Sequence, residues 1–299
     1  MIQRLVFAAA AVSIGVIAMP AATQTEPQEL RALPVTAPTL VSRYGTAPMQ
    51  FGELRVPAGR GPFPVAIVIH GGCWLREMES TRGTAPIASA LAARGIATWN
   101  IEYRALGDPG AGWPGSWQDW GSAADHLRSL ARRHRLDLRR VVAVGHSAGA
   151  PAAVFLAARR RLPGSAEIRG RNPLPISAVV AIDAPPDITN LVGPDREICG
   201  QPVIERLMGG TPDQHPDRYR SASPVAQLPL GVPVWMVRSS PVLQEAWAES
   251  YRSAAAARGD RVEILVPEGG DHFNVVHTGR PQWTEVERLI VAAANLPRR

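Results

Sequence analysis

The chain has 299 residues, 45% of them hydrophobic, and carries a formal net charge of +6. Its 32 basic residues are all arginine, so Schiff-base chemistry and phosphate-loop chemistry that require lysine are excluded. The length suits a single large α/β domain. The arginine runs lie near the ends of predicted helices and lack interleaved aromatic residues, so we expect no nucleic-acid partner.

The N-terminal residues have the pattern of an export signal. Arg4 precedes an apolar stretch over 5–17, and small residues follow up to Ala22. This predicts a signal peptide over 1–22, a polar, proline-containing linker over 23–38 and a folded α/β domain over 39–299. We therefore expect a periplasmic or secreted protein. The apolar stretch is too short to predict a stable membrane anchor, although an uncleaved helix tethering the protein is the alternative.

Strand and helix signals alternate along the rest of the chain. Alternation of this kind predicts an α/β fold, a mostly parallel sheet with helices on both faces. The expected strands are 50–56, 65–69, 96–101, 141–145, 176–183, 233–238 and 261–266. The expected helices are 84–94, 119–134, 148–160, 244–257 and 283–295.

A glycine turn, His70-Gly71-Gly72-Cys73-Trp74, follows the first buried strand. Such a turn can direct consecutive backbone N–H groups at one point, which is what a tetrahedral intermediate requires. We expect Gly72 and Cys73 to supply oxyanion donors. His70 is expected to brace the turn by hydrogen bonding rather than to transfer protons.

A Gly-x-Ser-x-Gly motif, Gly145-His146-Ser147-Ala148-Gly149, lies between a strand signal and a helix signal. Glycines two residues either side of the serine allow a sharp strand-to-helix turn that exposes the hydroxyl. This setting predicts Ser147 as a nucleophile. The N-terminus of the following helix adds the Ala148 N–H group as a third oxyanion donor.

A histidine with the required chain order follows the last strand signal. His272 lies in a glycine-containing loop far beyond the serine, which predicts it as the general base. The remaining histidines, His146 among them, are interpreted as surface or packing residues. No zinc spacing or His-Glu-x-x-His pattern is present, so neither a metal nor a cofactor is predicted.

The carboxylate of a catalytic triad has several candidates. No acidic residue follows the strand signal at 233–238 before Glu245. Asp183 ends the preceding strand signal and should lie near the same rim of the sheet, so it ranks first. Glu245 ranks second, and Asp187 and Glu268 rank lower.

The substrate surroundings are expected to come from loops. The proline-rich and glycine-rich segment 184–232 would form a small lid or wall over the catalytic edge. Four tryptophans, Trp74, Trp113, Trp117 and Trp120, are candidates for an aromatic lining or for the core. The two cysteines, Cys73 and Cys199, can pair in an exported chain, but the sequence leaves this open.

These motifs resemble the α/β-hydrolase superfamily, and within it the esterase and arylformamidase group with His-Gly-Gly-x-Trp and Gly-His-Ser-Ala-Gly motifs. Further similar stretches are 99–104, 112–114 and 219–224. The resemblance covers residue 40 to the C-terminus and implies the same roles for the serine, the histidine and the oxyanion donors. One departure is that relatives typically carry an aspartate near Ser240 and Pro241.

The predicted activity is hydrolysis of short-chain or aryl carboxylic esters through an acyl-enzyme. One alternative is an arylformamidase-like amide hydrolase. Another is a weakly active or non-catalytic ligand-binding relative that lacks the usual acid. The expected partner is a small ester or amide substrate, and the sequence does not indicate an oligomeric state.

Overall fold

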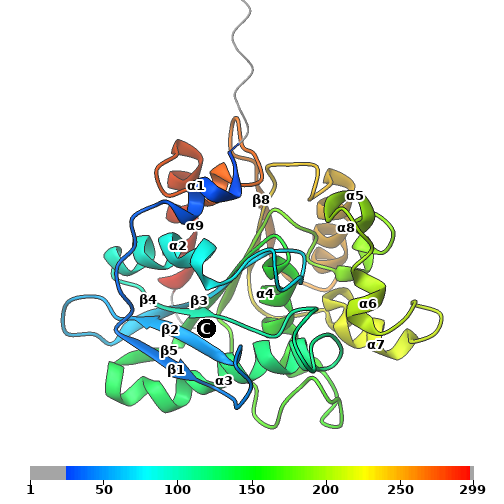
Figure 1. The fold of residues 1–299 in the computed structure, drawn as a ribbon, viewed down its shortest axis with the longest axis horizontal. Helices are drawn as coiled ribbons and strands as arrows, with labels where there is room; N and C mark the ends of the chain where they lie inside the picture. The colour runs from blue at the N-terminus through cyan, green and yellow to red at the C-terminus, as the bar shows by residue number, and fades with distance from the viewer. Residues whose placement is uncertain (1–24, 297–299) are drawn as a thin grey trace, which may run out of the picture.

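The computed structural model describes residues 25–296 and contains one mixed sheet (Figure 1). The strand order is β1-β2-β4-β3-β5-β6-β7-β8, in which β2 pairs antiparallel with both β1 and β4 and all later neighbours pair in parallel. The strands are β1 (Leu40–Arg43), β2 (Phe51–Arg55), β3 (Phe63–Ile69), β4 (Ala97–Ile101), β5 (Leu136–His146), β6 (Ala178–Ile182), β7 (Val234–Val237) and β8 (Val262–Leu265). The predicted α/β class with a mostly parallel sheet is confirmed.

The central strands are apolar on both faces because helices cover both faces. Along β3, Val65, Ile67 and Ile69 belong to one buried cluster, whereas Ala66 and Val68 belong to the other. This is the two-residue period of a strand, in a sheet whose two faces are both buried.

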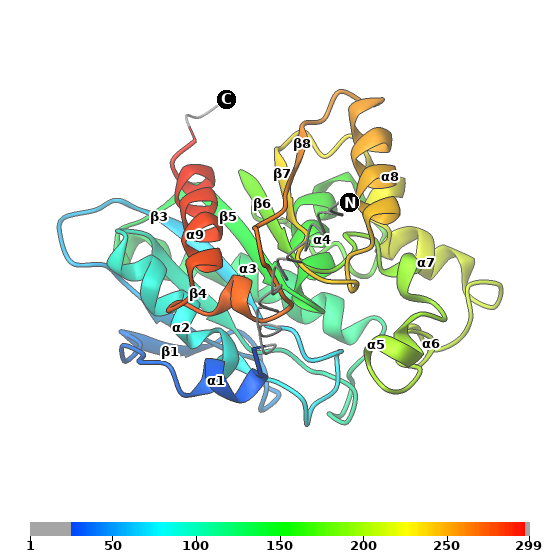
Figure 2. The same ribbon diagram turned by 90° about the horizontal axis from the view of Figure 1, so that it is seen from above.

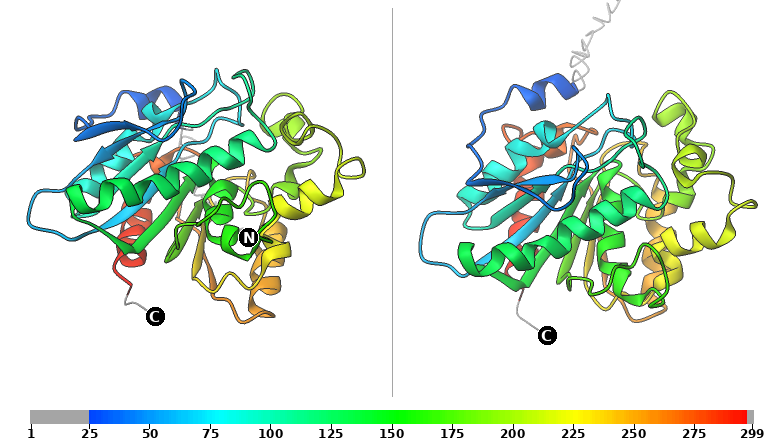
Figure 3. Two further views of the ribbon diagram at one scale, coloured as in Figure 1. Left: turned by 90° about the horizontal axis from the view of Figure 1, so that it is seen from below. Right: turned by 60° about the horizontal axis from the view of Figure 1, so that its bottom comes forward.

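Two groups of helices form the outer layers (Figures 2 and 3). The larger cluster takes buried residues from α3 (Gly115–His134), α4 (Gly149–Ala158) and α8 (Glu245–Ala256). The smaller cluster takes them from α1 (Pro27–Arg31), α2 (Thr81–Ala93) and α9 (Pro281–Ala294). Every residue of α4 is buried, which explains its alanine-rich composition. The helix following the nucleophile motif therefore lies directly against the sheet.

The segment 184–232 is more ordered than its composition indicates. It contains the α-helices α5 (Asp195–Ile198), α6 (Ile204–Met208) and α7 (Pro216–Ala222), together with the 3-10 helices η2 (Ile188–Leu191) and η3 (Pro224–Gln227). Short 3-10 helices also occur after α4, as η1 (Arg159–Arg161), and after β8, as η4 (Asn274–Val276). Helices of four to seven residues are too short to show a clear hydrophobic period.

The N-terminal part of the described chain differs from the predicted linker. Within 23–38, residues 27–31 form α1, and Leu30 is only 3% exposed and packs in the smaller core cluster. The linker prediction is therefore wrong for this stretch: one buried leucine in a five-residue helix anchors a segment whose other residues are mostly polar. The predicted signal peptide, 1–22, lies outside the described residues.

The fold brings the candidate residues to one edge of the sheet. The carboxyl ends of parallel strands meet at a common edge, where α/β proteins bind their ligands. The loops after β3, β5, β6 and β8 begin with or contain His70, Ser147, Asp183 and His272. Residues far apart in the chain are therefore neighbours there.

Candidate active site

Ser147 occupies a sharp turn between β5 and α4. Its φ is +54°, in the left-handed region that side chains rarely adopt, which is the strained geometry expected of the motif. The flanking glycines allow this turn because the backbones approach closely. A Cβ added to Gly145 would lie 1.9 Å from the Gly149 carbonyl oxygen, and one added to Gly149 would lie 2.2 Å from the Ile69 carbonyl oxygen.

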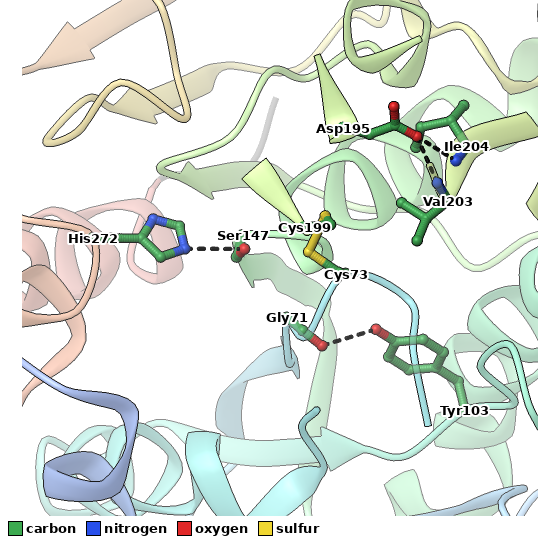
Figure 4. Close-up of a disulfide and its surroundings, with 9 residues drawn as sticks. All are labelled: Gly71, Cys73, Tyr103, Ser147, Asp195, Cys199, Val203, Ile204 and His272. Atoms are coloured by element: carbon green, nitrogen blue, oxygen red, sulfur yellow. Dashed lines mark hydrogen bonds between the residues drawn. A yellow bond between two sulfur atoms is a disulfide. The ribbon is translucent and has the colours of Figure 1, made fainter. Parts of the chain in front are cut away.

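The three predicted triad residues are in hydrogen-bonding contact. His272 Nε2 lies 3.1 Å from Ser147 Oγ, and His272 Nδ1 lies 2.7 Å from Asp183 Oδ2. A carboxylate only accepts, so Nδ1–H donates to Asp183, and Nε2 is left to accept from the serine hydroxyl. Figure 4 shows the histidine ring pointing its nitrogen at Ser147. The arrangement is that of a nucleophile, a base and an orienting acid.

Asp183 follows β6 but reaches the end of the neighbouring strand β7. Its backbone has φ +51°, and its N–H donates to the Val237 carbonyl oxygen. Its Oδ1 accepts the N–H groups of Ser239 and Ser240 at 2.8 and 3.0 Å, and Ser240 Oγ donates to Oδ2 at 2.5 Å. The loop that follows β7 thus supplies donors to the carboxylate rather than a carboxylate itself.

The Asp183 carboxyl is fully buried, yet it is held in its ionised form. Burial raises the pKa of Asp183, but the hydrogen bonds from His272 and Ser240 and the nearby imidazole outweigh burial and lower the pKa below its ordinary value. An ionised carboxylate at Nδ1 fixes the histidine tautomer that a general base requires.

The other acidic candidates have different partners. Glu245, whose side chain is 71% exposed, pairs with Arg238 at 3.6 Å. Asp187 accepts hydrogen bonds from Thr189 and Ser223. The Glu268 side chain is exposed, and His272 Nδ1 is bonded to Asp183 instead. Of the four carboxylates that the sequence offered, Asp183 is the one that contacts His272.

The glycine turn after β3 passes beside the serine. A Cβ on Gly71 would lie 2.7 Å from Ser147 Cβ, so only glycine fits there. Gly72, Cys73 and Trp74 all have positive φ. Within the described residues 25–296, no acceptor takes the backbone N–H of Gly72, Cys73 or Ala148. These groups remain free to donate to an oxyanion beside the serine.

His70 braces this turn, as expected. Its Nδ1 lies 2.9 Å from the Gly71 carbonyl oxygen, and its Nε2 lies 2.9 Å from Glu102 Oε1. Burial lowers the pKa of His70, but the Glu102 carboxylate outweighs burial and raises it. Tyr103 also donates its hydroxyl to the His70 carbonyl oxygen at 3.1 Å. Sequence reasoning assigned no role to Glu102 or Tyr103, although both lie in a stretch that supports the resemblance.

A disulfide joins the two cysteines. Cys73, in the glycine turn, is bonded to Cys199, which directly follows α5. Figure 4 shows the disulfide beside the Ser147–His272 pair. The segment 184–232 is thereby covalently tied to the loop that carries the candidate oxyanion donors. A hydrogen bond from the Trp113 backbone N–H to the Leu207 carbonyl oxygen, 2.7 Å long, ties the same segment to the connection between β4 and α3.

His146 contacts the base, which the sequence interpretation missed. Its Nε2 lies 2.7 Å from the His272 carbonyl oxygen, and the two rings lie 4.7 Å apart. Burial and the adjacent His272 lower the pKa of His146 to about 3. A neutral His146 donates Nε2–H to that carbonyl and adds no positive charge beside the base. Its position next to the nucleophile was the signal available in the sequence.

Three of the four tryptophans lie in the core rather than in a pocket. Trp74, Trp117 and Trp120 are almost fully buried in the larger cluster. Trp113 is half-buried, and its Nε1–H donates to Glu167 at 2.6 Å. Of the two alternatives that the sequence left open, the core is the one that the structure shows for these three. The spacing of Trp113, Trp117 and Trp120 is helical, and α3 places Trp117 and Trp120 on its apolar stripe facing the sheet.

Residues 25–296 contain neither a metal site nor a membrane span. No cluster of His, Cys, Asp and Glu side chains in that range is arranged to hold a metal ion. None of the helices there is both long and apolar enough to cross a bilayer.

Comparison with known proteins identifies the family. The BD-FAE family model matches residues 54–238, more than half of the chain and a range that includes Ser147 and Asp183. The chain belongs to the BD-FAE family. The chain is also similar to Esterase LipC of Mycobacterium tuberculosis, with 26% identity over 249 residues. That match covers 79% of this chain and 60% of the relative, so the chain spans less than two thirds of the relative's length.

Solved esterase structures share the fold. Esterase B from Lactobacillus rhamnosis, solved with a C4-C4 tributyrin phosphonate inhibitor, matches with a TM-score of 0.70 and 21% identity, over 89% of this chain and 88% of its own. Esterase 2 from Thermogutta terrifontis, phosphonylated by sarin, matches with a TM-score of 0.67 and 17% identity, over 84% and 92%. The chain therefore has the α/β-hydrolase fold that its motifs resemble.

Proposed function

We propose that the protein is a serine hydrolase that cleaves carboxylic esters through an acyl-enzyme. The observation that carries the proposal is the continuous hydrogen-bonded series from Ser147 through His272 to Asp183. Each member has the partner that its role needs: the hydroxyl has a base, and the base has an ionised acid behind it.

In the proposed reaction Ser147 Oγ attacks the acyl carbon while its proton passes to His272 Nε2. The N–H groups of Gly72, Cys73 and Ala148 stabilise the oxyanion of the tetrahedral intermediate. The alcohol leaves with the proton from His272. Water then gives a proton to His272, attacks the acyl carbon and releases the carboxylic acid, and the proton returns to Ser147.

The substrate preference is proposed to be for short acyl chains or aryl esters. The segment tied down by the Cys73–Cys199 disulfide supports a confined site rather than an open groove for long chains. The related esterase B was solved with a tributyrin phosphonate, a short-chain ligand. We also propose that the chain is exported, because residues 1–22 have the pattern of a signal peptide and a disulfide persists in oxidising compartments.

A fluorophosphonate probe tests the nucleophile directly. The protein lacking 1–22 is treated with the probe, and the adduct is located by peptide mass spectrometry, with Ser147→Ala as the control. We expect rapid labelling of Ser147 and none of the variant. Acetate and butyrate esters of p-nitrophenol should be hydrolysed faster than the palmitate ester. A folded protein whose serine does not react would refute the proposal and favour the ligand-binding alternative.

An arylformamidase-like activity is the second candidate, since the same residues serve amide hydrolysis. It needs efficient protonation of a nitrogen leaving group by His272. Comparing N-formyl-aniline with phenyl acetate separates the two activities. We expect the ester to be the better substrate.

A further inference from the structure

The first described residues contact the turn that carries the candidate base. The Thr25 N–H donates to Asp271 Oδ2 at 3.1 Å. The other oxygen of Asp271 accepts the N–H groups of Phe273 and Asn274, at 2.8 and 2.6 Å. Asp271 therefore orders the backbone around His272, and Thr25 binds the remaining carboxylate oxygen.

A few residues later the same segment contacts the loop after the glycine turn. Arg31 Nη2 donates to the Met78 carbonyl oxygen at 2.6 Å and lies 3.3 Å from Glu79 Oε2. Glu79 in turn packs on the glycine turn, because a Cβ added to Gly72 would lie 2.6 Å from Glu79 Cβ. Arg31 thus forms an ion pair with Glu79, which contacts the candidate oxyanion donor Gly72.

Between these two ends the segment is anchored. Leu30 is buried in the cluster that α2 and α9 share, and Glu29 pairs with Arg280 at 3.1 Å. Figure 1 shows α1 lying beside the connection from β8 to α9, and the right-hand view of Figure 3 agrees. Contacts at both ends of the segment and at its buried leucine therefore hold it in place.

The sheet itself does not join the two loops that this segment contacts. The glycine turn follows β3 and the histidine loop follows β8, and β5, β6 and β7 lie between these strands. No strand pairing within the described chain therefore fixes the oxyanion donors directly relative to the base. A small displacement between such groups is enough to slow catalysis strongly.

We propose that residues 25–31, the N-terminal strap, are a positioning element of the active site. The strap holds the glycine turn and the histidine loop in fixed positions relative to each other. The proposal rests on the proposed function for its catalytic readout. The strap begins three residues after Ala22, the end of the predicted leader, so a protein that has lost 1–22 retains the strap. The strap contacts no reacting atom and acts through Asp271 and Glu79.

The test compares the protein spanning 23–299 with one spanning 32–299, together with Arg31→Ala and Arg31→Lys. The control is Arg252→Ala, an exposed arginine in an ion pair with Glu249 on α8. Removing the strap should lower kcat by about tenfold or more with little change in KM, since misplacement by about 1 Å costs this much or more. Arg31→Ala should lower kcat about threefold, because the ion pair is partly exposed. Arg31→Lys should restore part of the loss, and Arg252→Ala should change nothing.

Hydrogen–deuterium exchange provides a readout that does not depend on activity. Loss of the strap should speed exchange in peptides covering 71–82 and 269–277, and leave 178–182 in β6 unchanged. Unchanged exchange in the two loops would overturn the proposal, whatever the activity. Faster exchange with unchanged kcat would also overturn it. An unreactive Ser147 in the 23–299 protein together with faster exchange would refute the proposed function while retaining the docking of the strap on both loops.

Discussion

Replacing Asp183 with asparagine tests the acid most directly. The carboxylate accepts four hydrogen bonds: two from backbone N–H groups on Oδ1, and two on Oδ2, from Ser240 Oγ and His272 Nδ1. In Asp183→Asn, the side-chain amide keeps an oxygen for the backbone donors but turns an NH₂ group towards Nδ1. The imidazole then accepts at Nδ1 and carries its proton on Nε2, where it cannot take the proton from Ser147.

The expected loss in kcat is about 10⁴-fold, equivalent to about 5 kcal/mol of barrier. The fold should survive because the amide has the same shape and the backbone donors stay satisfied. The assay is p-nitrophenyl acetate hydrolysis with the fluorophosphonate labelling rate measured in parallel. Glu245→Gln, at the acid that ranks second from sequence, is the matched control and should stay near wild type. Activity of Asp183→Asn within tenfold of wild type, or an equal loss in Glu245→Gln, would contradict the reasoning.

Three further outcomes are expected. Ser240→Ala removes one donor to the Asp183 carboxylate and should raise the pKa of Asp183. The value of kcat should fall about tenfold, and the pH at which activity is lost on the acid side should rise, while Ser240→Thr retains activity. His146, with a folded pKa of about 3 against 6.5 when unfolded, contributes stability that is complete above pH 6.5 and is lost as pH falls towards 3. Urea titrations should show a decline on the order of 5 kcal/mol that His146→Gln reduces. Cys199→Ser opens the disulfide and should lower the free energy of unfolding by about 2–5 kcal/mol and decrease kcat, with differential scanning calorimetry and kinetics as the measurements.

The sequence alone determined the fold class and two members of the site. Strands that are apolar throughout predict a sheet covered on both faces, and the glycine spacing around Ser147 has a local steric cause, so both could be recognised without the structure. His272 followed from chain order. Asp183 could be ranked first only because strands of a parallel sheet end at one edge.

The tertiary structure decided which groups meet. That Asp183 reaches the end of β7 depends on its left-handed backbone and on the N–H groups of Ser239 and Ser240, which no local pattern reveals. The disulfide required two loops more than a hundred residues apart to come within bonding distance. The strap was unrecognisable for the same reason: its contacts with Asp271 and Glu79 are long-range, and a short polar segment carries no period of its own.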